Sequence, residues 1–345
     1  MYIDKKTKQQ NNCLNFIKGC ACFGILYMHT SYDCLVSSVV SCLSRFAVLT
    51  FFMTSGYYCY SQDRNIVDNK MPKKLKHILK LCIGATILYF IEESVIVPIL
   101  SGEKIFILSF IKECCTWNKV TKFLLFNQLP FGGILWFLFA LLYCYLIFTI
   151  INRRNWYKGA YIAIPILIVL HIVSRGIIQY FNLIDENINI VWYRNFIFMG
   201  FPFFMLGNFI HKYEEKIVNK FTNKKLLMLI GAGLAISCFE RLVVVLELFW
   251  GTVLATFCIF VFAIKNPEKK VVPIMAAIGE KYSMPIYILH PIVSTLIYYI
   301  KCRMGLENNI LLAILNPMIV FITIPLLIKM CEGIRYGICK VTSEA

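Results

Sequence analysis

The sequence predicts an all-α, polytopic membrane protein: a bundle of about ten transmembrane helices with both termini in the cytoplasm. Of its 345 residues, 59% are hydrophobic. Only 16% are charged, against about 25% in an ordinary soluble domain. Such a chain has too little polar surface to cover a water-soluble globule. Soluble enzymes, disordered proteins and secreted disulfide scaffolds are therefore excluded.

Ten apolar runs of roughly 20 residues, the length that crosses a bilayer, are the predicted spans. They cover residues 13–32, 36–60, 78–100, 132–151, 159–180, 195–211, 226–240, 242–264, 283–300 and 310–330. The segment 102–131 is less apolar and has an amphipathic pattern. We interpret it as an interfacial or lid segment on the outer side of the membrane.

Basic residues set the predicted sidedness, because cytoplasmic loops carry the excess of Lys and Arg. The formal charge of +16 is spread over the N-terminus, the loops after every second span and the C-terminal end. This dispersal argues against nucleic-acid binding. We expect a cytoplasmic tail at 1–12, one transmembrane domain at 13–330 with a cytoplasmic basic loop at 61–77, and a cytoplasmic tail at 331–345.

The 15 cysteines show no C-x-x-C pair, and most lie inside apolar spans. We interpret them as small buried hydrophobic residues and expect no metal site. Cys34, Cys114, Cys115 and Cys302 fall on the predicted outer side, where they could form disulfides.

Lys18 and His29 both lie in the first predicted span. A separation of eleven residues puts the two side chains on one helical face, about 16 Å apart along the axis. A cation near the cytoplasmic mouth and an imidazole deeper in the membrane suit an elongated anionic donor. A coenzyme A thioester has that shape. Alternatively, Lys18 reaches to lipid headgroups and His29 is a hydrogen-bonded histidine of the bundle.

Further polar residues inside predicted spans mark functional sites, because charged groups are costly in the membrane. Arg45 opens the second span, and Glu92 and Glu93 lie in the third. An Arg–Glu tie between them would be either structural or catalytic. His290 lies between two prolines, which predict a kinked helix of the kind that lines cavities. It could face the same cavity as His29.

Two segments, one at the end of the second span and one after it, have more than one interpretation. Ser55-Gly56 allows helix backbones to approach closely, and Tyr58 follows as an amphipathic anchor. In "MPKKLKHILK", Lys73 and Lys76 recur with Lys80 at helical spacing, so one helix face is basic. That face would bind either anionic lipid or a nucleotide phosphate.

Polar residues also occur toward the outer ends of later spans. His171 and Arg175 lie in the fifth predicted span. Glu240, Arg241 and Glu247 cluster at the turn between the seventh and eighth spans, and we interpret this cluster as a local ion pair.

Five segments resemble, in order, motifs of the bacterial acyltransferase type 3 family of integral membrane O-acyltransferases. The resemblance covers about residues 12–330. The segments are "NFIKGCACFGILYMHT", "FFMTSGYYCY", "GGILWFLFALLY", "RNFIFMGFPFFMLGNFI" and "IGEKYSMPIYILHPIV". The resemblance implies a multi-pass protein of the bacterial cytoplasmic membrane. Such a protein would move an acyl group, usually acetyl, from cytoplasmic acyl-coenzyme A to a hydroxyl of an extracytoplasmic cell-envelope glycan or similar acceptor.

The resemblance also implies roles for individual residues. His29 becomes the catalytic residue, which would deprotonate the acceptor hydroxyl or carry the acyl group, and Lys18 becomes its basic partner. The family's Arg-x-x-Arg pair falls on Lys73 and Lys76, although Lys loses the bidentate contact that Arg makes with phosphate. The further donor-binding candidates are Arg45, Ser55 and Tyr58, and the substrate-cavity candidates are Glu92, Glu93, Trp136 and His290.

Two other functions remain open. The segment "RNFIFMGFPFFMLG" also resembles the membrane part of vancomycin-resistance serine racemases, which would make the chain a transporter of a small, serine-like molecule. A membrane-embedded interaction protein without chemistry is the third alternative. As an enzyme, the chain would act alone or with a separate extracytoplasmic partner protein, because it carries no esterase-like domain.

Overall fold

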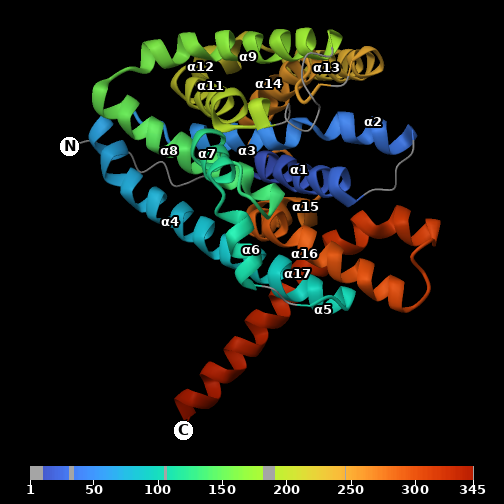
Figure 1. Cartoon of the computed structure of the whole chain (residues 1–345). Helices are drawn as coiled ribbons and strands as arrows, with labels where there is room; N and C mark the ends of the chain where they lie inside the picture. Colours follow the sequence, from blue (N-terminus) through green and yellow to red (C-terminus); the bar gives the residue numbers. More distant parts are fainter. Residues whose placement is uncertain (1–10, 31–34, 105–106, 182–190, 245, 345) are drawn as a thin grey trace. The chain divides into compact units, whose positions relative to one another are not determined.

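The computed structural model describes residues 11–30, 35–104, 107–181, 191–244 and 246–344, and within them every regular element is a helix (Figure 1). The predicted all-α class is therefore confirmed. Within these residues, seven helical segments are long and apolar enough to cross a membrane. They are Ser37–Tyr57, Arg64–Ser101, Gly133–Arg154, Tyr157–Tyr180, Asn223–Val243, Pro273–Arg303 and Ile310–Gly333.

The remaining three predicted spans also form helices, but these helices are shorter or more polar than the seven. Phe196–Lys212 and Trp250–Lys265 are apolar helices shorter than the seven. The run predicted at 13–32 forms a helix over Asn12–Thr30, whose first two turns carry the polar residues Asn15 and Lys18.

The chain divides into two compact units. Unit 1 comprises Met1–Ala47 and Phe262–Ala345, and unit 2 comprises Val48–Val261. Nearly all of the predicted tail at 1–12 lies outside the described residues.

Unit 1 is built around α1, which contacts each of the unit's other helices. Gly279 shows how closely they pack, since a Cβ on it would collide with the backbone oxygen of Asn15 in α1. The absence of a side chain there lets η4 lie directly against α1 near Lys18. The helices of unit 1 are α1 (Asn12–Thr30), α2 (Leu35–Ser44), α15 (Pro273–Ala277), η4 (Ile278–Tyr282), α16 (Ser283–Arg303) and α17 (Ile310–Glu344).

Unit 2 holds the remaining helices, of which α3 and α14 continue across its boundaries into unit 1. Those up to α8 are α3 (Phe46–Tyr57), α4 (Arg64–Ile91), η1 (Glu92–Ile96), α5 (Val97–Ser101), α6 (Ile107–Cys114), α7 (Trp117–Phe126), η2 (Gly133–Leu135) and α8 (Trp136–Arg154). The later ones are α9 (Tyr157–Tyr180), η3 (Phe196–Gly200), α11 (Phe201–Lys212), α12 (Glu214–Lys220), α13 (Asn223–Val243) and α14 (Trp250–Lys265).

Two pairings organise unit 2: α4 packs along α8, and α9 packs along α11. Gly56 in α3 lies against the backbone of Phe204 in α11, where a Cβ would collide with the carbonyl oxygen. The close backbone approach predicted for Ser55-Gly56 is therefore confirmed.

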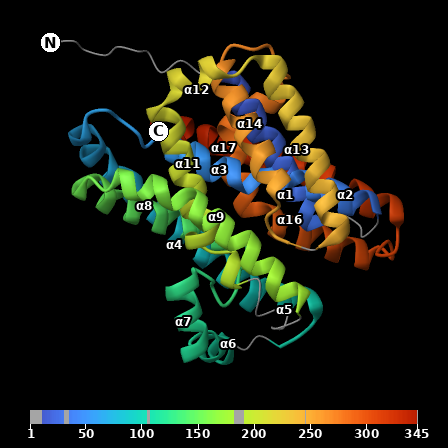
Figure 2. The same cartoon turned by 90° about the horizontal axis from the view of Figure 1, so that it is seen from above.

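The segment 102–131 forms two short helices, α6 and α7, in place of one long span. Neither contains a buried residue, and Figure 2 shows them at the edge of unit 2. Their exposed large hydrophobic residues include Leu108 and Trp117. Exposed apolar side chains on short helices are typical of interfacial segments, and the outer, interfacial position of this segment stays a prediction.

Candidate functional site

Lys18 and His29 lie on one unbroken helix, α1, in unit 1. The eleven-residue spacing therefore falls on regular helix, as the shared face requires. Lys18 is partly buried and its Nζ donates a hydrogen bond to Oδ1 of Asn15, 3.2 Å away. His29, near the other end of the helix, is exposed.

His290 in α16 is fully buried and lies beside His29, with ring centroids 5.5 Å apart. Its Nδ1 lies 3.0 Å from the carbonyl oxygen of Ile286 and 2.9 Å from that of Tyr287. Carbonyl oxygens only accept hydrogen bonds, so we assign the ring proton to Nδ1. Nε2 then carries the free lone pair, and it has no hydrogen-bond partner within the described structure. The packing of α16 on α1 thus joins the two histidines into one cluster.

Arg45 belongs to unit 1, where it lies between α2 and α3, whereas Glu92 and Glu93 belong to unit 2. Glu92 is buried in the π-helical turn η1. The Glu93 carboxylate accepts a 2.7 Å hydrogen bond from the backbone N–H of Gly132. Glu93 therefore holds the loop before α8, which is a structural task.

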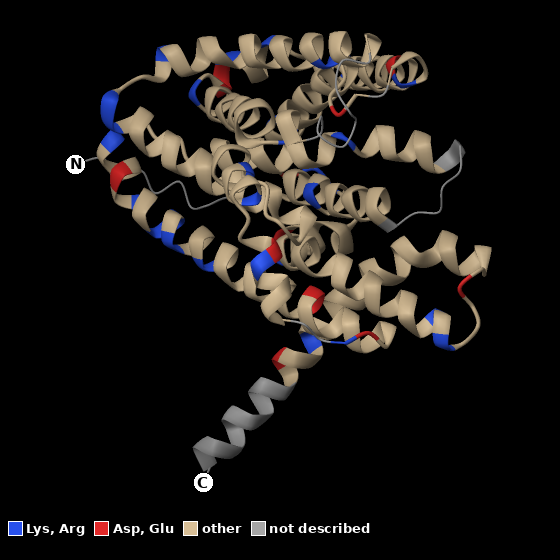
Figure 3. Cartoon of the chain, in the orientation of Figure 1, with Lys and Arg blue, Asp and Glu red and all other residues tan. Residues whose placement is uncertain are grey.

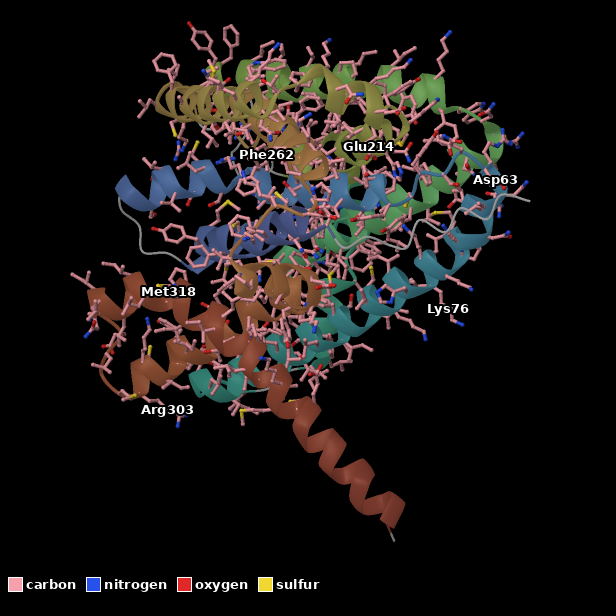
Figure 4. All side chains as sticks on the ribbon, turned by 180° about the vertical axis from the view of Figure 1, so that it is seen from behind. Asp63, Lys76, Glu214, Phe262, Arg303 and Met318 are labelled. Carbon is pink, nitrogen blue, oxygen red and sulfur yellow. The ribbon has the colours of Figure 1, made fainter. Side chains whose placement is uncertain are left out.

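The basic helix α4 divides its lysines between two faces. Lys73 and Lys76 are exposed. Figure 3 shows the basic residues along the first half of α4, and in Figure 4 the Lys76 side chain points away from the helix. Lys74 instead turns inward, and its Nζ contacts the carbonyl oxygen of Tyr58 at 3.0 Å and Sγ of Cys59 at 3.3 Å. It is Lys74, therefore, that the structure brings to the Ser-Gly-x-Tyr segment.

The inward position of Lys74 could have been predicted from the sequence. Lys74 follows Met71 by three residues and precedes Ile78 by four, and both of these are buried in α4. That spacing places Lys74 on the packed face of the helix. Burial raises the pKa of the neighbouring Cys59 thiol, and the Lys74 ammonium partly offsets this effect.

The Ser-Gly-x-Tyr segment is anchored by polar groups of unit 2. Ser55 is hydrogen-bonded to Tyr145. The Tyr57 hydroxyl donates to a carboxylate oxygen of Glu214 over 2.6 Å. His211 stacks on the Tyr57 ring, with centroids 4.3 Å apart, and its Nδ1 lies 2.7 Å from the Tyr57 carbonyl oxygen. This end of α3 is consequently held in a fixed conformation.

Trp136 begins α8, and its position is fixed by two neighbours. Nδ2 of Asn127 donates to its carbonyl oxygen over 2.8 Å. The guanidinium of Arg194 lies 5.9 Å from its ring centroid, within the range of a cation–π interaction. Trp136 and Arg194 together present a flat aromatic surface beside a cation.

The local ion pair expected among Glu240, Arg241 and Glu247 is wrong. Glu240 accepts hydrogen bonds from backbone N–H groups at the start of α14. Glu247 pairs instead with Arg175 of α9, and Nε of Arg175 lies 3.0 Å from its carboxylate oxygen. The two side chains are 5% and 10% exposed. Residues distant in sequence therefore compensate each other's buried charge.

Among the described residues, no group of three or more His, Cys, Asp or Glu side chains is arranged to hold a metal ion. Cys114, Cys115 and Cys302 are free thiols. Cys34, the fourth cysteine considered for a disulfide, lies outside the described residues.

Comparison with known proteins identifies the domain. The model of an acyltransferase domain matches residues 11–330, which is nearly the whole chain. No curated protein and no solved structure matches it.

Proposed function

Because the chain belongs to the acyltransferase type 3 family and is a membrane acyltransferase, we propose that it is an O-acyltransferase of the bacterial cytoplasmic membrane. It moves an acyl group, acetyl in the first instance, from cytoplasmic acyl-coenzyme A to a hydroxyl of a cell-envelope glycan or similar acceptor. The observation that carries the proposal is α1, which holds Lys18 near one end and, near the other, His29 beside the buried His290.

His29 acts as the general base in this proposal. One ring nitrogen takes the proton of the acceptor hydroxyl while the hydroxyl oxygen attacks the thioester carbonyl carbon. The carbon–sulfur bond then breaks, the thiolate takes the proton from His29, and the products are an ester and free coenzyme A thiol. His29 is the group to test because it is exposed on α1.

In this proposal, lysine side chains bind the negatively charged donor. The phosphates of acyl-coenzyme A need cations, and Lys18 is partly buried on the same helix as His29. An open cavity of about 480 Å³ in unit 1, between the start of α1 and α15, is lined by Lys269 and Lys270 together with Glu268 and Glu280. In unit 2 the exposed Lys73 and Lys76 are the donor-binding candidates.

The remaining candidates have supporting roles in the proposal. Arg45, Ser55 and Tyr58 contribute to donor binding, and Trp136 with Arg194 offers a flat surface on which the sugar ring of an acceptor could stack. Glu92 and Glu93 are the substrate-cavity candidates beside Trp136 in the sequence-based proposal, and Glu93 holds the loop that leads to Trp136. No step of the proposed reaction needs a metal.

Thiol release in detergent is the direct test, since a detergent micelle holds no gradient. The purified chain, given acetyl-coenzyme A and cell-envelope glycan, is expected to release coenzyme A thiol and to form acetyl ester in equal amounts. A transporter, the alternative, would release no thiol in detergent and would move serine only across sealed vesicles. That second result would overturn the proposal.

A further inference from the structure

We propose that His290 is a positioning residue for His29: its Nε2 accepts an N–H of His29, so that the other nitrogen of His29 is turned toward the acceptor hydroxyl as the base. The inference rests on the proposed function and deepens it. It concerns only unit 1, within which α1 and α16 pack together.

The first support is the fixed tautomer of His290. Two carbonyl oxygens of its own helix, those of Ile286 and Tyr287, lie within 3.0 Å of Nδ1. Both can only accept a hydrogen bond, so Nδ1 carries the proton and Nε2 carries the lone pair. A ring held in this way offers an acceptor in one fixed direction.

The second support is that this acceptor, Nε2 of His290, is buried and unpaired within the described residues. His290 is fully buried, and its Nε2 has no hydrogen-bond partner. A buried polar atom without a partner is rare in native proteins and calls for an explanation, such as a catalytic role. The neighbouring imidazole of His29, 5.5 Å away between centroids, supplies a donor of the right kind.

A modest rotation of His29 would close this hydrogen bond. The two rings are inclined by 40° and their centroids are 5.5 Å apart, a separation that a hydrogen bond between two ring nitrogens can span once they face each other. Hydrogen bonds of catalytic groups are often long without substrate and shorten in the productive complex. The exposed position of His29 leaves it room to turn.

The proton balance follows from this geometry. His29 keeps one proton on the nitrogen that faces His290 and gains a second from the acceptor hydroxyl at its other nitrogen. The resulting imidazolium is stabilised by the lone pair of His290. His29 then returns the gained proton to the coenzyme A thiolate, so His290 holds its own proton at Nδ1 throughout.

His171 provides a matched control. It is also fully buried, and its Nε2 also lacks a partner. Its ring, however, lies against Tyr193 in unit 2, with centroids 5.3 Å apart, and not against a second histidine. Replacing His171 therefore removes a similar buried imidazole without touching His29.

Steady-state kinetics give the first readout. In detergent, His290→Leu is expected to lower kcat by about 10- to 100-fold, no more than the lower end of general-base effects because His29 itself remains, and to leave the donor KM within twofold. His290→Gln, whose amide oxygen can reach the position of Nε2, is expected to recover part of the rate. His171→Leu should leave kcat within threefold. Equal kcat values for His290→Leu and wild type would overturn the inference, as would equal losses in His290→Gln and His290→Leu.

Chemical modification gives a second readout that does not depend on acyl transfer. Diethyl pyrocarbonate acylates neutral imidazole, and mass spectrometry reports its rate at His29. With folding confirmed by thermal unfolding, we expect His290→Leu to slow this modification at least threefold, and His290→Gln and His171→Leu to change it less. An unchanged rate in His290→Leu would overturn the positioning role. Failure of the proposed function is distinct, because the wild type itself would then release no coenzyme A thiol in detergent.

Discussion

At the scale of single residues, the exposed lysines of α4 offer the first test. If Lys73 binds donor phosphate, Lys73→Glu should raise the KM for acetyl-coenzyme A at least fivefold and lower kcat less, because only donor binding is weakened. Lys220→Glu, an equal change of charge at an exposed position of α12, is the control and should change neither constant. An unchanged KM in Lys73→Glu would favour binding of anionic lipid.

The buried pair of Arg175 and Glu247 predicts a loss of stability. Removing one member of a buried ion pair leaves the other charge uncompensated, at a cost of about 3–5 kcal/mol. We expect Arg175→Met to lower the thermal unfolding midpoint in detergent, and Arg175→Met with Glu247→Leu to recover most of it. A double variant as unstable as the single one would show that the ion pair is not the cause.

Individual side chains show what the sequence could reveal of the site. The eleven-residue spacing was sufficient to place Lys18 and His29 on one helix face, because a regular helix joins them. That His290 could share a cavity with His29 was a hypothesis, and their direct contact could not be derived because 261 positions separate the two residues. Glu247 was assigned to its sequence neighbours for the same reason, although its partner is Arg175. Sequence spacing describes one helix, whereas a pair of helices is set by packing.

At the scale of elements, the contact between η4 and α1 predicts a sensitive glycine. A Cβ at position 279 would collide with the backbone of Asn15, so Gly279→Ala must push the two helices apart. Overpacking of this kind costs about 1–3 kcal/mol. We expect a lower unfolding midpoint and reduced acyl transfer. Gly231→Ala, where nothing lies within 4 Å, is the control, and equal behaviour of the two variants would contradict this account.

Helix positions were predictable because apolar runs of membrane length leave few alternatives. The π-helical turns inside these helices were not predictable. The π-helical turns η1, η3 and η4 have no spacing signal in the sequence, and residues in them make contacts distant in sequence, such as that of Glu93 with Gly132. The segment 102–131 was recognised as separate from the spans, but its division into α6 and α7 was not foreseen.

At the scale of the whole molecule, the distribution of basic residues predicts which side of the membrane each loop occupies. Cys115 is exposed beside α6, on the predicted outer side, and Cys331 is exposed on α17, near the predicted inner end. We expect a membrane-impermeant maleimide to label Cys115 in intact cells, and Cys331 only in inverted vesicles. Cys115→Ser should remove the first signal. The reverse pattern would contradict the predicted sidedness.

The central claim is that His29 performs acyl transfer from coenzyme A. The most direct measurement is the release of coenzyme A thiol in detergent by wild type and by His29→Ala, with acetyl-coenzyme A and acceptor present. His171→Ala serves as the control, because that buried histidine lies against Tyr193 in unit 2. We predict acceptor-dependent release by wild type and a loss of about 100-fold or more in His29→Ala, with equal expression and folding. Wild-type turnover by His29→Ala would contradict the account.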